Sequence, residues 1–147
     1  MSEKELIAAN KRAYHDYIIH RTFEAGIALK GQEVKSIRDR HVVLKDSFAR
    51  VINNELYLCN CHIRHYPQSQ DTLDPERDRK LLLHRREIQE LARKIEAKGF
   101  TVVPLKIYIV HNLVKCELGL AQSKKKFDKR QELKEKDIER QIQRAFK

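Results

Sequence analysis

Residues 23–38 read Phe-Glu-Ala-Gly-Ile-Ala-Leu-Lys-Gly-Gln-Glu-Val-Lys-Ser-Ile-Arg, and this stretch decides the fold. An apolar, strand-like run passes through Gly31 into a short, charged helical pattern. Gly26 interrupts the apolar run, which indicates a bulge or a close backbone approach, and Gly31 lies where period 2 changes to period 3.6. The sequence before this stretch is expected to form one strand, and the sequence after it to close a sheet around that strand.

The length and charge of the chain limit the number of domains and the kinds of partner that are expected. Its 147 residues suit one domain, and 31 Lys plus Arg against 21 Asp plus Glu give a net charge of +10. This excess predicts a polyanionic partner, either a nucleic acid or an anionic membrane. No run of about 18 apolar residues is present, so no membrane span is expected. Residues 1–7 lack a secretory signal pattern and the three cysteines suit a reducing compartment, so we predict a cytoplasmic protein.

The N-terminal part of the chain predicts a leader, a strand and a helix. Residues 1–13 are polar and weakly helical, and they are expected to form a mobile leader. From Tyr14 to Leu29 apolar and polar residues alternate as in a long half-buried strand, although Arg21 interrupts the inward-facing set. Residues 32–38 then place two apolar side chains on one face of a short helix.

A first hairpin follows this helix. Strands are predicted over residues 47–52 and 55–63, joined by Asn53-Asn54, because Asn tolerates the positive φ of a tight turn. Residues 65–79 contain two prolines and many polar side chains, which predicts a long loop. Residues 80–83 fit either a short strand or the start of a helix.

The next segments predict a long helix and a second hairpin. Residues 85–98 repeat apolar side chains at helical spacing, and Gly99 supplies a C-terminal stop. Alternating residues over 101–110 and 113–121 predict two strands joined by the turn His111-Asn112. Up to six strands with two inserted helices and no βαβ rhythm predict a mainly β fold, a six-stranded antiparallel barrel like the oligonucleotide-binding (OB) fold with inserted helices.

The C-terminal segment differs in composition from the rest of the chain. Residues 123–147 hold ten Lys or Arg against five Asp or Glu and few apolar side chains. We therefore predict two parts, an RNA-binding barrel over residues 1–122 and a basic tail over residues 123–147. The tail is expected to be disordered alone and helical when it is bound to a polyanion.

Candidate catalytic and metal groups are few. Cys59, Cys61 and His62 suggest a metal site, but in a strand the two thiols share one face and the imidazole points to the other, which favours buried thiols. Glu24 and Glu33 could pair as acid and base, but no nucleophile motif or phosphate loop accompanies them. We therefore predict no enzyme activity, no cofactor and no metal.

Basic clusters at loops and chain ends favour a nucleic-acid partner. Tyr14, Tyr17 and Tyr57 add rings on which bases could stack. The clusters are Lys11-Arg12, Lys35 to Arg38, Arg77 to Lys80, Lys124 to Lys126 and Lys129-Arg130.

Five motifs run in order through nearly the whole chain. They are Phe23-Glu-Ala-Gly-Ile, Gly31-Gln-Glu-Val-Lys-Ser-Ile-Arg, Leu44-Lys-Asp-Ser-Phe, Asp74-Pro-Glu-Arg with Arg79-Lys-Leu-Leu-Leu-His-Arg-Arg-Glu-Ile, and Lys124-Lys-Lys-Phe-Asp-Lys-Arg. Together they resemble the small protein B family, the transfer-messenger RNA (tmRNA, SsrA) binding proteins of bacteria.

The resemblance implies an OB-type barrel and a role in trans-translation, the rescue of ribosomes stalled on messages without a stop codon. In that family the barrel binds the tRNA-like domain of tmRNA and promotes its delivery to the stalled 70S ribosome. Alanyl-tRNA synthetase and elongation factor Tu are partners through the tmRNA complex. The tail enters the decoding centre and the empty messenger channel. The expected protein is a monomer that is not an enzyme.

The family's functional residues carry over to two sets of positions. The tmRNA contacts match Asn10, Tyr17, Glu24, Leu82 and Lys115, although Tyr17 and Leu82 could equally be core residues. The decoding-centre residues match Phe127, Asp128, Lys129 and Arg130, for which the alternative is a charged linker. A supporting basic patch is expected from Lys35, Arg38, Arg77, Lys80, Lys124 and Lys125.

The chain departs from the family pattern at four places. A glycine is usual near Asp39 or Arg40, where this chain has none. Asn is usual at Val43, Gly at Ser123, and His or Tyr at Phe127. Because Phe cannot donate a hydrogen bond, this last departure favours stacking at position 127.

Two other functions fit the sequence. The first is a general single-stranded RNA or ribosome-associated OB-fold binding protein, which would bind tmRNA and unrelated RNA equally well. The second is a hydrolytic enzyme that uses Glu24, Glu33 or a histidine.

Overall fold

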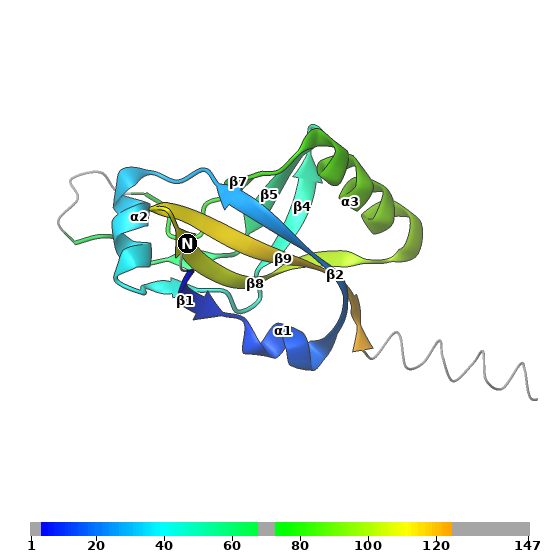
Figure 1. The fold of residues 1–147 in the computed structure, drawn as a ribbon, viewed down its shortest axis with the longest axis horizontal. Coiled ribbons are helices and arrows are strands. Elements are labelled where there is room, and N and C mark those ends of the chain that lie inside the picture. The colour runs from blue at the N-terminus through cyan, green and yellow to red at the C-terminus, as the bar shows by residue number, and fades with distance from the viewer. Residues whose placement is uncertain (1–3, 68–72, 125–147) are drawn as a thin grey trace, which may run out of the picture.

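A ring of six antiparallel strands forms the centre of the protein (Figure 1). The computed structural model describes residues 4–67 and 73–124. Each strand of the ring pairs with the next, and the last pairs with the first. In this order the strands are β2 (Tyr17–Ile27), β9 (Leu113–Ser123), β8 (Thr101–Val110), β4 (Phe48–Ile52), β5 (Glu55–Cys59) and β7 (Arg79–Leu82). The prediction of a mainly β, antiparallel fold is confirmed.

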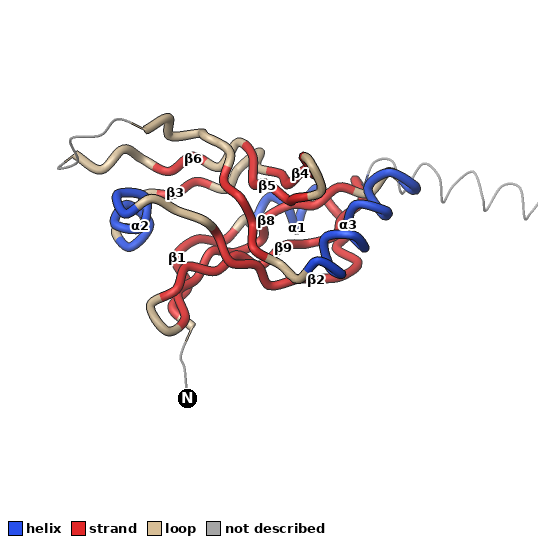
Figure 2. Tube along the Cα trace, turned by 90° about the horizontal axis from the view of Figure 1, so that it is seen from above, coloured by secondary structure: helices blue, strands red, loops and turns tan. Residues whose placement is uncertain are grey.

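Within residues 4–67 and 73–124, three further strands and three helices lie outside this ring. In Figure 2, α2 lies beside β3 and β6, which pair only with each other, and α3 lies at the opposite end of the molecule. The strand β1 pairs with β8. The bounds of these elements are β1 (Glu5–Ala9), α1 (Lys11–Asp16), α2 (Gly31–Arg38), β3 (Val42–Val43), β6 (His62–Ile63) and α3 (Arg85–Lys98).

Both predicted hairpins are confirmed, but the strand predicted over residues 55–63 ends at Cys59, and His62–Ile63 form the separate strand β6. Asn53 and Asn54, between β4 and β5, have φ values of 51° and 64°, and His111 and Asn112, between β8 and β9, have 51° and 62°. Consecutive positive φ angles are those of a type I′ turn, whose twist matches that of antiparallel strands. The turn residues therefore set the register of both hairpins.

The long helix is also confirmed. It covers Arg85–Lys98, and Gly99 follows in the left-handed conformation at φ 68°, where the absence of a Cβ removes the steric cost. Ile88 and Leu91 face the core from this helix. The segment that could have been a strand or a helix start forms the strand β7.

Residues 1–13 were predicted to form a mobile leader, and this prediction is wrong for residues 5–13, which form β1 and the start of α1. The strand β1 pairs with β8, and Ile7 is buried in the core. The helix α1 follows, so the strand predicted to start at Tyr14 starts at Tyr17 instead. Asn10 caps α1, since its side-chain oxygen accepts a hydrogen bond from the Ala13 amide at 3.2 Å.

The irregularity of the long strand lies at His20 and not at Gly26. The pairing of β2 with β9 shifts between Ile19 and Arg21, so His20 is the extra residue of a β-bulge. The bulge explains why Arg21 interrupts the alternation: the inward and outward sets exchange faces there. Beyond the bulge Phe23 and Ala25 are buried, while Glu24 points outward.

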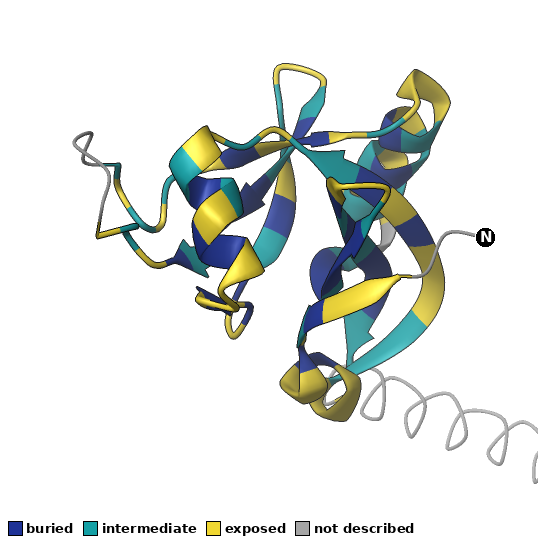
Figure 3. Cartoon of the chain, turned by 60° about the vertical axis from the view of Figure 1, so that its left-hand side comes forward, coloured by how far each residue is buried: buried dark blue, intermediate teal, exposed yellow. Residues whose placement is uncertain are grey.

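The core lies inside the ring and under α3. Leu56, Leu81 and Leu91 are fully buried there. Leu105 is also fully buried, but in a second, smaller cluster with Ala13, Val103 and Ala121. Figure 3 shows buried segments alternating with exposed ones along the strands and on α2. Full burial of a leucine contributes roughly 1.5–3 kcal/mol, so this core holds the strands in place.

Two further points concern the ends and the surface. No helix among the described residues is long and apolar enough to cross a membrane. Residues 125–147, which contain most of the predicted basic tail, lie outside the described residues.

Candidate RNA-binding surface

Three of the predicted RNA contacts meet on the outer face of the ring. Gly26 on β2 pairs with Leu82 on β7 and with Lys115 on β9, and Lys115 also pairs with Tyr108 on β8. Alternation along β2 places Glu24 on the same outward face as Gly26. We call these five residues, Glu24, Gly26, Leu82, Tyr108 and Lys115, the central face.

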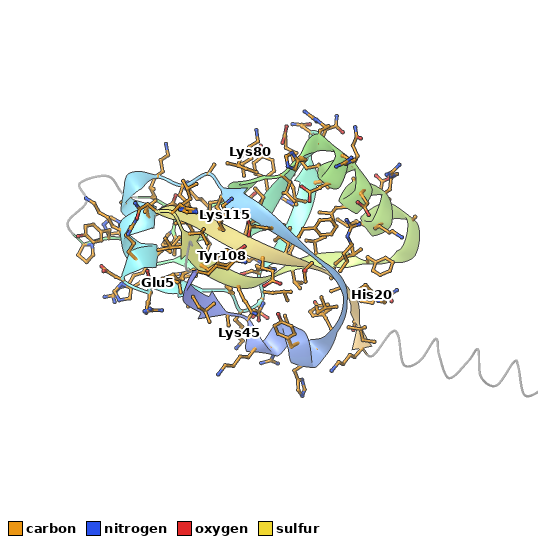
Figure 4. All side chains as sticks on the ribbon, in the orientation of Figure 1. Glu5, His20, Lys45, Lys80, Tyr108 and Lys115 are labelled. Atoms are coloured by element: carbon orange, nitrogen blue, oxygen red, sulfur yellow. The ribbon has the colours of Figure 1, made fainter. Side chains whose placement is uncertain are left out.

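The Glu24 carboxylate is held by three neighbours on this face. The Tyr108 hydroxyl donates a hydrogen bond to it, the Lys115 ammonium lies 3.4 Å from one of its oxygens, and Lys4 lies 3.8 Å from the other. Figure 4 shows Lys115 and Tyr108 close together on neighbouring strands. The hydrogen bond from Tyr108, and then Lys115, hold the pKa of Glu24 below its usual range. Glu24 is therefore an ionised acceptor with about half of its side chain open to solvent.

Leu82 is exposed, which answers the question left open by the sequence of whether it is a core residue or a surface residue. Its exposed fraction is 52%, whereas its neighbour Leu81 is fully buried, as alternation along β7 requires. Leu82 therefore does not belong to the core. An apolar side chain beside a cation and a carboxylate can contact a base, a phosphate and an amino or hydroxyl donor together.

Tyr17 and Asn10 lie at the other end of β2. Tyr17 is seven residues from Glu24, or roughly 23 Å along the strand. It is half-buried against the core around Val103 and also lines a groove of about 510 Å³ with Arg12 and Lys124. Tyr17 is thus partly a core residue and partly a surface residue, so neither alternative from the sequence holds alone.

The Asn10 side chain is used inside the fold. It is buried, and its amide nitrogen donates to the carbonyl of Pro104 at 3.0 Å and to that of Leu44 at 3.4 Å. Its oxygen caps α1. These bonds join three segments, and the exposed Arg12 lies on the helix that Asn10 caps.

The supporting basic patch does not form one surface. Lys35 and Arg38 lie on α2, whereas Lys124 lies beyond β9 at the opposite end of the molecule (Figure 1). Arg77 is turned inward to Glu33, and Lys80 lies 3.8 Å from Glu55. The exposed members of the predicted patch that the structure describes therefore lie apart, on α2, on β7 and beyond β9.

Sequence reasoning missed the buried role of Glu33 and Arg79. Glu33 accepts hydrogen bonds from Arg79 Nε at 2.9 Å, from Arg77 Nε at 3.0 Å and from the Lys30 amide at 2.8 Å. Burial would raise the pKa of Glu33, but the bonds from Arg77, Lys30 and Arg79 outweigh it and lower the pKa. The cluster joins α2 to β7 and the preceding loop, so Glu33 has a structural partner for each oxygen and is not placed as a catalytic acid.

The cysteines are buried thiols, as the sequence indicated. Cys59, Cys61 and Cys116 are free, and burial raises the pKa of Cys59 and Cys61 to about 11. Such thiols remain protonated and unreactive at neutral pH. Among the described residues no group of three or more His, Cys, Asp or Glu is placed to hold a metal ion.

The tail residues Lys125, Phe127, Asp128, Lys129 and Arg130 lie outside the described residues. Their assignment to the decoding centre remains a prediction. Ser123 ends β9 opposite Tyr17, which places the start of the tail beside α1.

Comparison with known proteins shows which family this chain resembles. A family model described as "SmpB protein" matches residues 7–147. The SsrA-binding protein of Halalkalibacterium halodurans is 52% identical over 147 residues, which cover 99% of this chain and 96% of the relative. That of Geobacillus kaustophilus is 51% identical over 146 residues, with 99% and 94% covered. A solved structure described as "tmRNA-SmpB: a journey to the center of the bacterial ribosome" matches at 52% identity and a TM-score of 0.67, with 80% and 83% covered.

Proposed function

The chain belongs to the SmpB protein family, and on this basis we propose that it is an SsrA-binding protein, which binds tmRNA and acts in trans-translation on the ribosome. The family match extends from residue 7 to residue 147. In this role the protein binds RNA and is not an enzyme.

The observation that supports RNA binding by this chain's own residues is the convergence of Glu24, Leu82 and Lys115 from three strands onto the central face. Lys115 supplies a cation for a phosphate, Leu82 an apolar contact, and Glu24 an acceptor for a base amino group or a 2′-hydroxyl. The three side chains are separated widely in sequence, and the pairing of β2 with both β7 and β9 brings them together.

The finer account of the site follows from this arrangement. We take the ring of six strands with its inserted helices as an OB-type barrel that meets the tRNA-like domain of tmRNA through the central face. Tyr17, with Arg12 and Lys124 around the groove beside it, forms a second contact at the other end of β2. Asn10 contributes by holding α1, which carries Arg12, against the ring.

The remaining partners belong to the same proposal. The bound tmRNA is presented to alanyl-tRNA synthetase and elongation factor Tu, and the complex is delivered to the stalled ribosome in the cytoplasm by a monomer of this protein. The basic tail over residues 123–147 forms a separate part, disordered alone and helical on the ribosome. Phe127 to Arg130 then act in the decoding centre.

A binding assay tests the proposal. The affinity of the full chain for a transcript of the tRNA-like domain is compared with its affinity for an unrelated RNA hairpin of the same length, at several salt concentrations. The expected result is a clear preference for the tRNA-like domain, and Lys115→Glu should weaken that binding. Equal affinity for the two RNAs would instead support the general single-stranded or ribosome-associated RNA-binding protein.

A further inference from the structure

Gly26 forms the floor of a hollow in the central face, and we propose that this hollow takes the flat face of an unstacked nucleobase of the bound RNA. The inference rests on the proposed function, because it names what the RNA places at the same face. It adds Gly26 and Leu113 to the residues that contact RNA.

The hollow exists because Gly26 has no side chain between two neighbours that have long ones. Leu82 and Lys115 are its direct partners on the two adjoining strands. A Cβ atom built at Gly26 would lie 3.4 Å from the Leu82 Cβ and 3.5 Å from its Cδ1, so it would occupy the space between these walls without a clash. Glycine thus leaves a strip of bare backbone open to the outside.

Two further apolar side chains complete the walls. Val34 comes from α2 and Leu113 from the start of β9, and the hollow measures about 360 Å³. Leu113 is 60% exposed and Leu82 is 52% exposed, the two largest values among the exposed large apolar side chains of the described residues. Two exposed leucines beside bare backbone offer a planar ring contact on its face and edges.

The charges around the hollow suit a nucleotide better than an apolar peptide. Lys115 lines the hollow and is placed to meet a phosphate, and the whole chain carries a net charge of +10. Glu24 lies two residues along β2 on the same face, roughly 7 Å away, where a carboxylate can accept from an exocyclic amino group. We therefore specify a base that carries an amino group, in a single-stranded or looped part of the RNA.

The first test fills the hollow. In Gly26→Ala the new methyl group takes the place of the base, and the backbone there is not in the left-handed region, so the chain should fold normally. Gly31→Ala is the matched control, because a Cβ at Gly31 meets nothing within 4 Å. Leu113→Ala removes a wall, and Val43→Ala, which truncates an exposed apolar residue on β3, is its control.

We expect Gly26→Ala and Leu113→Ala each to weaken binding of the tRNA-like domain at least about fivefold, the lower end of the loss of one stacked base. The two controls should bind as the unchanged protein does. If the unchanged protein binds this RNA and Gly26→Ala binds it equally well, the inference fails while the proposed function stands.

The second test needs no tmRNA. The amide of Gly26 and the methyl groups of Leu82 and Leu113 are followed by NMR while cytidine, adenosine or guanosine monophosphate is added, with ribose 5-phosphate as the comparison. Shifts at these three residues with the nucleotides, absent in Gly26→Ala, would support a base in the hollow. Equal shifts with ribose 5-phosphate, or no shifts with any nucleotide, would overturn it.

Discussion

The Tyr108 hydroxyl donates a hydrogen bond to the Glu24 carboxylate, although the two residues are 84 positions apart and lie on strands separated by β9. Tyr108 is buried to all but 5% of its surface, so its ring is fixed and its hydroxyl is a stationary donor. Lys115, from the strand between them, approaches the other carboxylate oxygen. Glu24 is thus oriented before any RNA arrives.

This relationship predicts a pH effect in Tyr108→Phe. Because the tyrosine hydrogen bond is the largest cause that lowers the pKa of Glu24, its loss should raise that pKa toward 4.5. Glu24 would then be protonated, and lose its acceptor role, at a higher pH than in the unchanged protein. RNA affinity measured from pH 4 to pH 7 should therefore start to fall at a higher pH in the variant.

Tyr57→Phe serves as the control for this experiment, because Tyr57 lies on β5, which does not pair with the strand β2 that carries Glu24. Its profile should follow that of the unchanged protein. A profile of Tyr108→Phe that is weakened by the same factor at every pH would contradict the account, since it would indicate a packing defect and no effect on Glu24.

The buried cluster around Glu33 predicts a large stability loss in Glu33→Gln. Arg79 is 1% exposed and would lose the carboxylate that neutralises it, and breaking such a buried pair costs about 3–5 kcal/mol. Urea unfolding measures the change. Glu55→Gln, which removes an acceptor from the surface lysine Lys80 and from Arg85, should change the stability by less than about 1 kcal/mol.

The same cluster predicts acid sensitivity. Because the pKa of Glu33 is lower in the folded protein than its usual 4.5, its contribution to stability is full above that value and is lost as the pH falls through the folded pKa. The free energy of unfolding of the unchanged protein should thus fall more steeply below pH 4.5 than that of Glu33→Gln. Parallel curves for the two proteins would contradict this assignment.

Arg40 explains one departure from the family pattern and yields a matched pair of variants. Its φ is 65°, the left-handed region in which glycine is unstrained and other residues cost roughly 1–2 kcal/mol. Its side chain repays part of this by donating to the Leu6 carbonyl at 2.7 Å and by approaching Glu5. Arg40→Gly and Arg40→Ala both lose these contacts and differ only in whether residue 40 tolerates a positive φ. The glycine variant should therefore be more stable than the alanine variant by about 1 kcal/mol in urea unfolding. Equal stabilities would show that the backbone at residue 40 relaxes.

Lys115 predicts a change in salt dependence. If its ammonium meets one phosphate, Lys115→Gln should reduce the slope of log affinity against log salt by roughly 0.7 to 0.9 and weaken binding at low salt. Lys94→Gln is the control, because Lys94 lies on α3 and faces the Phe100 ring. Similar slope changes in both variants would indicate that Lys115 adds only general charge.

Much of the fold could be predicted because local chemistry determines it. The turn pairs Asn53-Asn54 and His111-Asn112, and Gly99, take backbone angles that few other residues tolerate, so they marked two hairpins and a helix end in advance. β1 and α1 could not be found in this way. They are five and six residues long, and what holds them is pairing with β8 and the bonds of Asn10 to distant carbonyls.

The site was only partly predictable, because it too depends on contacts between residues that are distant in sequence. Outward positions for Glu24 and Lys115 follow from alternation, but their 3.4 Å contact depends on the register between β2 and β9. The bulge at His20 shifts that register, and the sequence showed only that Arg21 interrupts the alternation, not that His20 is an extra residue. Arg77 read as part of a basic surface, yet it faces Glu33, whose burial follows from how α2 packs.

Sequencing of the RNA that co-purifies with the protein tests the central claim most directly. The tagged full chain and its Lys115→Glu variant are isolated from the same bacterial cells, and their bound RNAs are compared. The account predicts that tmRNA is the most enriched RNA with the unchanged protein and that its enrichment falls in the variant. Absence of tmRNA, or its recovery in proportion to its cellular abundance beside other RNAs, would contradict the account.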